Sequence, residues 1–234
     1  MSHVATKHIL KEMSEAFAKK SSDSDALSVN IQVDTTEDEP FQWHVICSDN
    51  EIHYGPGFSE SAVTTFSLDQ GTLQKLYDGT WNGLTAAGRA HVNDPAPLNF
   101  TMPRDRDPLS FMREGYFFVT HFFNTSIPTR LKFGPGHTRT IHGAGACALF
   151  YTEGLRSAYY CVSGNEVLNA DGAKDPMHQA FIVIGGQGAA TIGEETVSVS
   201  RGDVLYIPPN TIHMLKADEG DSVEMIWLAW GDKA

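Results

Sequence analysis

The chain has 234 residues, of which 41% are hydrophobic and 20% charged, and its formal net charge is −12. This length allows one large or two modest domains to fold without disulfide bonds. The acidic charge argues against a nucleic acid partner, because affinity for phosphate backbones depends on basic side chains that displace counterions. Cys47, Cys147 and Cys161 have no metal-binding or redox spacing. Their odd number, with no secretory signal or apolar run near the roughly 20 residues of a membrane span, predicts a cytoplasmic protein with reduced thiols.

The first hundred residues combine helical and strand patterns. Apolar residues at helical spacing predict a surface helix over residues 5–20. Residues 27–68 contain short runs in which apolar and polar side chains alternate, and they predict an antiparallel meander. Asp69 is placed to cap the next helix, which Gly79 closes, and a second helical stretch follows at about 82–90. We therefore expect a small α+β domain at the N-terminus.

Residues 66–92 carry the most specific pattern of this first half. A strand leads to a helix that ends at Gly79, and Asn82, an alanine-rich helix and Gly88 follow. This arrangement resembles the sterol carrier protein 2 family over residues 5–100. The resemblance implies a sheet covered by helices around an apolar tunnel that takes lipids or acyl chains. Two alternatives stay open: the apolar side chains fill a small core, or the domain serves in dimerisation or docking.

A proline-rich, charged passage at residues 93–108 has no apolar periodicity and is typical of a domain boundary. We expect domains at residues 1–104 and 105–234. The aromatic stretch 116–123 is predicted to begin the second domain as a strand.

The second half is organised around residues 179–213. Apolar runs of strand length at 181–184 and 204–207 are separated by glycine-rich turns, which we place at 185–188 and at Gly202-Asp203. Pro208-Pro209-Asn210 then ends the ladder, because proline has no N–H to donate.

The spacing Gly202-x5-Pro208-x4-His213 resembles the second motif of the cupins, and the resemblance covers residues 110–234. It implies an all-β jelly-roll barrel, a homodimer and an inward-facing His213 that binds a metal ion. The first cupin motif, two histidines and a glutamate, puts Ala173 and Asp175 at the histidine positions and Gln179 at the glutamate position. The metal signature is therefore mostly missing.

Alternation along the strand separates two of the candidate ligands. If Gln179 faces into the barrel, His178 faces out unless a bulge re-aims it. Asp175, Gln179 and His213, with His178 beside them, are the candidates for one divalent iron, zinc, nickel or manganese ion. Alternatively, His213 is a hydrogen-bonding or general-base residue in a metal-free pocket, or a structural histidine.

Arg156 and Tyr159 lie on or beside another predicted strand. The arginine is placed to clamp a carboxylate substrate through paired hydrogen bonds, with the tyrosine as acid or hydroxyl donor. In the alternative, Arg156 pairs with Glu153 or Glu166 at the barrel rim. His142 is predicted to be a surface or rim residue.

These residues lead to two functional hypotheses. In the first, the barrel binds a small, partly apolar organic metabolite, and any turnover is that of a metal-dependent or histidine-assisted lyase, isomerase or oxygenase centred on His213. In the second, the protein is a non-catalytic binding, sensing or lipid-carrying protein.

Overall fold

The structure is a computed structural model that describes residues 2–21, 27–48, 51–91, 93–101, 103 and 106–234. Its contacts divide the chain into two compact units, and each unit is built from two separate stretches of sequence. Met1–Ala87 and Pro95–Leu131 form the first, and Gly88–Asp94 and Lys132–Ala234 form the second. This division differs from the single cut near residue 105 that the sequence suggests. None of the helices in the described ranges has both the length and the apolar character to cross a membrane.

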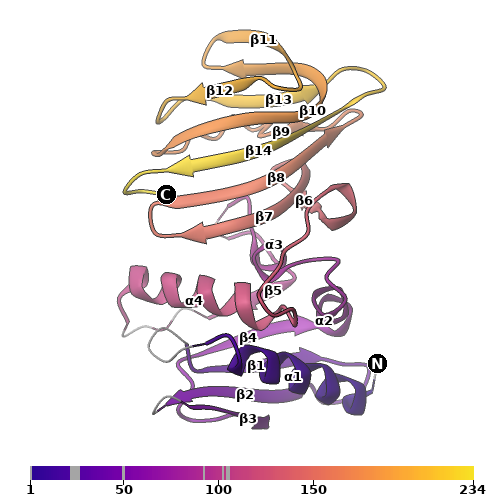
Figure 1. Cartoon of the computed structure of the whole chain (residues 1–234), viewed down its shortest axis with the longest axis vertical. Helices are drawn as coiled ribbons and strands as arrows, with labels where there is room; N and C mark the ends of the chain where they lie inside the picture. The colour runs from indigo at the N-terminus through magenta and orange to yellow at the C-terminus, as the bar shows by residue number, and fades with distance from the viewer. Residues whose placement is uncertain (1, 22–26, 49–50, 92, 102, 104–105) are drawn as a thin grey trace. The chain divides into compact units, whose positions relative to one another are not determined.

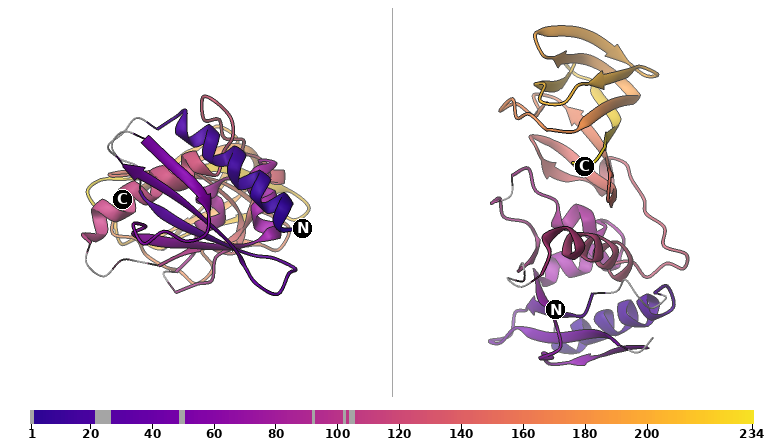
Figure 2. Two further views of the ribbon diagram at one scale, coloured as in Figure 1. Left: turned by 90° about the horizontal axis from the view of Figure 1, so that it is seen from below. Right: turned by 90° about the vertical axis from the view of Figure 1, so that its left-hand side faces the viewer.

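The first unit contains a five-stranded sheet in the order β3-β2-β1-β4-β5, with helix α1 (His3–Ala18) lying across one face (Figures 1 and 2). The strands are β1 (Val29–Asp34), β2 (Phe41–Ser48), β3 (Glu51–Pro56), β4 (Thr64–Asp69) and β5 (Leu98–Phe100). Strands β1, β2 and β3 are antiparallel, as predicted, but β4 pairs with β1 in parallel. The prediction of a wholly antiparallel meander is therefore wrong at β4. Alternation reveals which face of a strand is buried, and it does not identify the neighbouring strand.

Three further helices complete this unit: α2 (Gln70–Tyr77), α3 (Gly83–Ala87) and α4 (Pro108–Phe122). The Asp69 side chain caps α2, as predicted, and accepts a hydrogen bond from the Thr72 N–H at 2.7 Å. Asp107 caps α4 in the same way, and Pro108 stands in its first turn, where a missing N–H is harmless. The stretch 116–123, predicted as a strand, mostly belongs to this helix. Its aromatic residues favour a strand locally, but the cap and the helical spacing of the buried rings prevail.

Aromatic rings from three elements fill the space between the sheet and its helices. The Phe118 ring of α4 stacks on Phe66 of β4 at 5.4 Å and on Phe122 at 4.7 Å, and it meets the edge of Phe17 of α1 at 5.2 Å. All four side chains are fully buried, and burial of each contributes about 1.5–3 kcal/mol. The resemblance of this unit to sterol carrier protein 2 stays a prediction.

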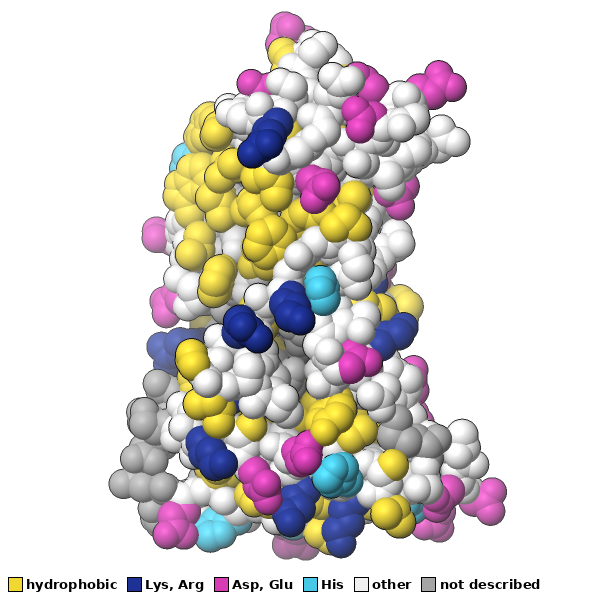
Figure 3. All heavy atoms as spheres, turned by 45° about the vertical axis from the view of Figure 1, so that its right-hand side comes forward, with side chains coloured by type: hydrophobic (Ala, Val, Ile, Leu, Met, Phe, Trp, Pro, Cys, Tyr) yellow, Lys and Arg dark blue, Asp and Glu magenta, His cyan; other side chains and the backbone are white. Residues whose placement is uncertain are grey.

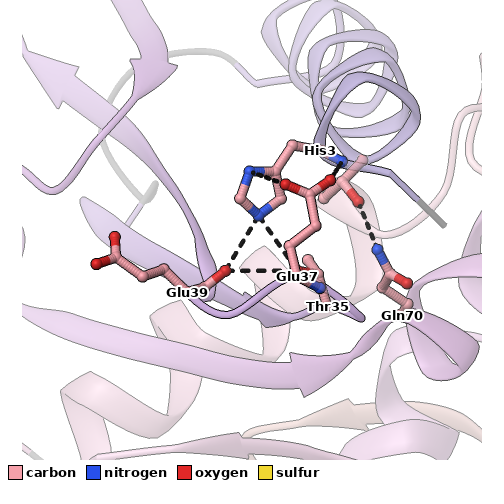
Figure 4. A network of polar contacts seen from close by, with 6 residues as sticks. His3, Thr35, Glu37, Glu39 and Gln70 are labelled. Carbon is pink, nitrogen blue, oxygen red and sulfur yellow. Dashed lines mark hydrogen bonds and ion pairs between the residues drawn. The ribbon is translucent and has the colours of Figure 1, made fainter.

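Polar contacts fix the first turn of α1 against the loop between β1 and β2 (Figure 4). The His3 ring places Nδ1 3.1 Å from the Glu37 carboxylate and Nε2 3.1 Å from the Glu39 carbonyl oxygen. Glu37 also accepts a hydrogen bond from the His3 backbone N–H at 2.9 Å. A carboxylate at this end of a helix is favourable because the unpaired N–H groups there carry partial positive charge.

The second unit is a β-barrel with two walls that share one long strand, β10 (His178–Ile192) (Figure 1). The first half of β10 pairs with β12 and β14, and the wall continues through β8 and β7 to β6. The second half pairs with β11 and β13, and β9 completes that wall. The other elements are η1 (Pro135–His137), β6 (Arg139–Ile141), β7 (Ala144–Thr152), β8 (Leu155–Ser163), β9 (Val167–Leu168), β11 (Glu195–Ser200), β12 (Val204–Ile207), β13 (His213–Ala217) and β14 (Ser222–Trp230).

Strand β10 passes without interruption through the predicted glycine turn at 185–188, so that prediction is wrong. The register shifts between Val183 and Gly185, and Gly186 has a φ of 73°. A Cβ at Gly186 would lie 1.5 Å from the Ser222 carbonyl oxygen, and one at Gly188 would lie 2.1 Å from that of Lys216. The glycines therefore allow a bulge and a close backbone approach where the strand leaves one wall for the other.

The barrel interior is packed with apolar side chains that include Ala158, Tyr160, Phe181 and Leu215. On the outside, Figure 3 shows hydrophobic side chains gathered on one side of this unit. Exposed apolar residues of the unit include Phe150, Val204 and Tyr206. The wall that contains β7 and β12 therefore carries apolar side chains on both its inner and its outer face.

Candidate functional site

A cavity of about 270 Å³ opens inside the barrel and is lined wholly by residues of the second unit. Apolar side chains form much of its wall, among them Ile141, Ala158, Leu168, Met177, Phe181 and Trp227. Pockets for drug-sized ligands usually span about 300–1,000 Å³, so this cavity suits a small molecule. Its polar side chains are contributed by both walls and by the connecting segments of the second unit.

Gln179 holds a fixed orientation at the cavity. It is fully buried, and its Oε1 accepts a hydrogen bond of 2.6 Å from the Trp227 indole N–H. Because an indole nitrogen can only donate, the amide oxygen must face Trp227 and the amide nitrogen must face the other way. There Nε2 donates to Asp175 Oδ2 at 3.0 Å. Gln179 thus positions the Asp175 carboxylate at the cavity surface.

His213 is the first residue of β13 and follows the predicted corner at Pro208-Pro209-Asn210. Its Nδ1 lies 3.0 Å from the Thr211 carbonyl oxygen. A carbonyl can only accept, so Nδ1 carries the proton, and in the neutral ring Nε2 has the lone pair. Nε2 lies 3.7 Å from Asp175 Oδ2, which is too far for a direct hydrogen bond. His213 therefore offers an acceptor beside the Asp175 carboxylate.

Two of the candidate residues lie outside the cavity. His178 faces outward, where Nδ1 lies 2.7 Å from the Tyr206 hydroxyl and its ring stacks on Trp230 at 5.9 Å. The Tyr159 hydroxyl donates to Glu224 at 2.5 Å, and burial together with this hydrogen bond raises the tyrosine's pKa. Neither side chain is part of the cavity lining. Successive side chains of a strand point to opposite faces of the sheet. Gln179 and Arg156 face the cavity, so His178, one residue from Gln179, and Tyr159, three residues from Arg156, face the other way.

Arg156 lines the cavity from β8. Within the part of the chain that the structure describes, its Nε is buried and has no hydrogen-bond partner. Its guanidinium carbon lies 5.7 Å from the centre of the Tyr151 ring, which also lines the cavity. Glu166, a partner in the alternative interpretation, instead accepts a hydrogen bond from the Ser163 backbone N–H at 3.0 Å. Arg156 therefore has a donor without a protein partner among the described residues, and the clamp role stays a prediction that this geometry allows.

Sequence reasoning missed two histidines that line the cavity. His142, predicted at the surface or rim, lines the cavity, and burial lowers its pKa against the opposing effect of the Asp175 carboxylate. Its ring meets that of His91 at 5.9 Å, and His91 pairs with Asp171 at 3.0 Å. His91 belongs to Gly88–Asp94, a segment that precedes the rest of the second unit by nearly forty residues. No local pattern connects it with the barrel.

Asn169 was also missed. It follows β9, is only 4% exposed and has a φ of 58°, a conformation that asparagine adopts more readily than most residues. Its Nδ2 donates to the carbonyl oxygens of Ala173 and His213, each at 2.9 Å. Its Oδ1 is buried and has no hydrogen-bond partner among the described residues. Asn169 also lines the cavity, so the cavity wall contains an acceptor without a protein partner among the described residues.

The donor atoms at the cavity do not fit a first-row divalent ion. His178 faces away, and the Gln179 amide oxygen is already bound by Trp227. His213 Nε2 and the Asp175 carboxylate are the two donors left of the predicted set, whereas sites for these ions normally use three or more protein ligands. Across the described ranges, no group of three or more histidine, cysteine, aspartate and glutamate residues is arranged to hold an ion. The predicted iron, zinc, nickel or manganese site is therefore not supported by this geometry.

The segment that supplies Asp175, Gln179 and His213 can be compared with known families. Residues 170–229 match the cupin domain. The cupin resemblance inferred from residues 202–213 is thus supported for this part of the chain, and the barrel of β10 to β14 agrees with it. Among curated proteins, none matches the chain.

Three bacterial proteins are among the solved structures that match part of this chain. A cupin 2 conserved barrel domain protein from Rhodopseudomonas palustris shares 21% identity, with a TM-score of 0.34, over 39% of this chain and 63% of its own. The plu4264 protein from Photorhabdus luminescens shares 18%, with a TM-score of 0.38, over 44% and 87%. A cupin 2 conserved barrel domain protein from Salinispora arenicola shares 16%, with a TM-score of 0.37, over 44% and 90%. Likeness at this level carries no information on the ligand of the cupin segment.

Proposed function

We propose that the cupin-type barrel binds a small, partly apolar organic acid and that Arg156 pairs with its carboxylate. The observation that carries this proposal is the Arg156 Nε, buried in the cavity wall without a hydrogen-bond partner among the described residues. A buried donor left unpaired costs about 1–3 kcal/mol, and more when the group is charged. A guanidinium also matches the geometry of a carboxylate through two parallel hydrogen bonds. A bound acid would therefore satisfy a group that the fold leaves unsatisfied.

The charge around the cavity agrees with an acidic ligand. Arg89, Arg156 and Lys174 line the cavity together with one carboxylate, that of Asp175. The whole chain carries a net charge of −12, so this local excess of cationic side chains runs against its general character. A recess with such an excess raises the local concentration of anions. The apolar wall between the polar groups suits a short hydrocarbon portion.

If the protein is an enzyme, we propose that His213 acts as its general base. The Thr211 carbonyl accepts the hydrogen bond from Nδ1–H, which leaves Nε2 of the neutral ring to take a proton from a carbon atom of the bound carboxylate, whose C–H electron pair stays on the ligand. Proton abstraction of this kind belongs to histidine-assisted lyase and isomerase reactions. A metal-dependent oxygenase reaction would need an ion that the donor set described above does not fit. In the alternative, a non-catalytic binding or sensing protein, the same acid would bind without turnover.

The proposal is tested by the affinity for a short carboxylic acid, with hexanoate as probe and isothermal titration calorimetry as readout. Arg156→Met should weaken binding at least tenfold, because a hydrogen bond to a charged group is worth about 1.5–3 kcal/mol and 1.4 kcal/mol corresponds to tenfold. Arg201→Met removes an exposed arginine of the same unit and should leave the affinity unchanged. Equal affinity of the parent and Arg156→Met, or no binding of any acid, would overturn the proposal.

We further expect the homodimer that the cupin resemblance implies. The exposed apolar side chains of the barrel, which include Val204 and Tyr206, support a contact between copies of this unit. Sedimentation equilibrium of the parent and of Tyr206→Glu is the test. A parent that stays monomeric at micromolar concentration would contradict this expectation.

A further inference from the structure

Arg156 and three candidate acceptors occupy different parts of the cavity lining. Arg156 lies on β8 in the first wall, where it is paired with Ala229 of β14. Ala229 is in turn paired with Gln179 of β10. Arg156 and Gln179 are thus two strands apart, or about 10 Å between Cα atoms. His213 and Asn169 belong to the facing wall, at the start of β13 and just after β9. The Arg156 side chain offers only donors.

The side near His213 offers acceptors. Asn169 Oδ1 is buried without a partner among the described residues, and His213 Nε2, the acceptor of the neutral ring, lies 3.7 Å from Asp175 Oδ2. The Asp175 carboxylate accepts one hydrogen bond from Gln179 and keeps further acceptor capacity. The Gln179 amide cannot turn to offer a different atom, because Trp227 fixes it. Asp175, Asn169 and His213 thus bring three acceptors, one of them a carboxylate, to the lining of one cavity, and Asn169 Nδ2 ties its residue to the His213 carbonyl at 2.9 Å.

We propose that the ligand is a small amino acid, with its carboxylate on Arg156 and its ammonium group on Asp175, Asn169 and His213. An ammonium group has three N–H donors and a positive charge, so it satisfies all three acceptors and neutralises Asp175. A hydroxyl group has one donor and would leave two of the acceptors unsatisfied. This assignment rests on the proposed function, because it takes the carboxylate on Arg156 as given and adds the second polar group.

The experiment separates the two claims. The probes are hexanoate, its 2-, 4- and 6-amino derivatives and the three matching hydroxy acids, titrated into the full chain at pH 7. We expect at least one amino acid to bind tenfold or more tightly than both hexanoate and the hydroxy acid of the same substitution. The series leaves the position of the amino group to the measurement.

Asp175→Asn should abolish this preference while hexanoate still binds, because the amide keeps an acceptor for Gln179 and loses the charge. Asp218→Asn, an exposed aspartate of the same unit, makes the same change in net charge and should keep the preference. If hexanoate, amino acids and hydroxy acids bind alike, or if Asp175→Asn keeps the preference, the amino acid assignment is wrong and the organic acid proposal stands. If none of the probes binds, both are wrong.

Discussion

Replacing Gln179 with glutamate is the sharpest test of the site geometry. The Trp227 N–H can still donate to one carboxylate oxygen, but the other oxygen would take the place of the amide nitrogen, 3.0 Å from Asp175 Oδ2. The variant loses a hydrogen bond to a charged group, worth about 1.5–3 kcal/mol. It also brings two carboxylates together, for which Coulomb's law at an effective dielectric constant of about 20 gives about 5 kcal/mol as an upper bound.

We expect Gln179→Glu to destabilise the protein by about 2–4 kcal/mol at pH 7, or about 4–16 °C in Tm for a chain of this size. Repulsion raises the pKa of the pair in the folded state, so the folded protein binds the additional proton more readily than the unfolded chain does. The deficit should therefore shrink as the pH falls from 7 to 5. Circular dichroism melts at the two pH values provide the measurement.

A metal ion should also reverse the deficit, because the introduced carboxylate would add a third ligand to Asp175 and His213. Zinc at about 100 µM, which would be in excess over a tight site, should raise the Tm of the Gln179→Glu variant and not that of the parent. Gln187→Glu, an exposed position of the same strand, is the control for the added charge. A Gln179→Glu variant as stable as Gln187→Glu at pH 7 would refute the hydrogen-bond geometry described for Gln179.

Three other variants test separate features of the barrel. Burial holds the pKa of His142 below its usual value, so the unfolded state takes up more protons and stability is lost as the pH falls below about 6.5. The His142→Asn variant, whose asparagine suits the φ of 54° there, should therefore show a smaller change in the free energy of unfolding, measured by urea melts, between pH 7 and pH 5. A pH dependence equal to that of the parent would contradict this. Tyr159→Phe should lower the free energy of unfolding by about 1–3 kcal/mol, because Glu224 loses its hydrogen-bond donor. The affinity for hexanoate should stay unchanged, and a large loss of affinity would show that Tyr159 contributes to ligand binding. Gly186→Ala should destabilise by more than about 3 kcal/mol, since its Cβ would lie 1.5 Å from the Ser222 carbonyl oxygen, and a thermal melt close to that of the parent would exclude the described bulge.

The features that the sequence predicts well are those encoded locally. The spacing from Gly202 to His213 indicates the barrel segment, and residues 204–207 form the predicted strand. Alternation alone separates the buried Gln179 from the exposed His178. Each of these inferences depends only on residues within about a dozen positions of each other.

The features that the sequence did not predict depend on contacts between residues that are far apart in the chain. The parallel pairing of β4 with β1 and the place of His91 at the barrel depend on which distant segments meet. Asn169 was missed because its importance lies in an acceptor left without a partner among the described residues, which is visible only when its neighbours are placed. Tyr159 is different, because the alternation that separates it from Arg156 was already available in the sequence.

The shared strand β10 has a consequence for how the barrel comes apart. Its first half is hydrogen-bonded to β12 and β14 and its second half to β11 and β13. Neither wall can lose its ladder without exposing part of the same strand, so the two walls should open in a single cooperative event. Amide hydrogens at the two ends of β10 should then exchange with deuterium at the same opening free energy, and a small molecule bound between the walls should slow exchange along the whole strand.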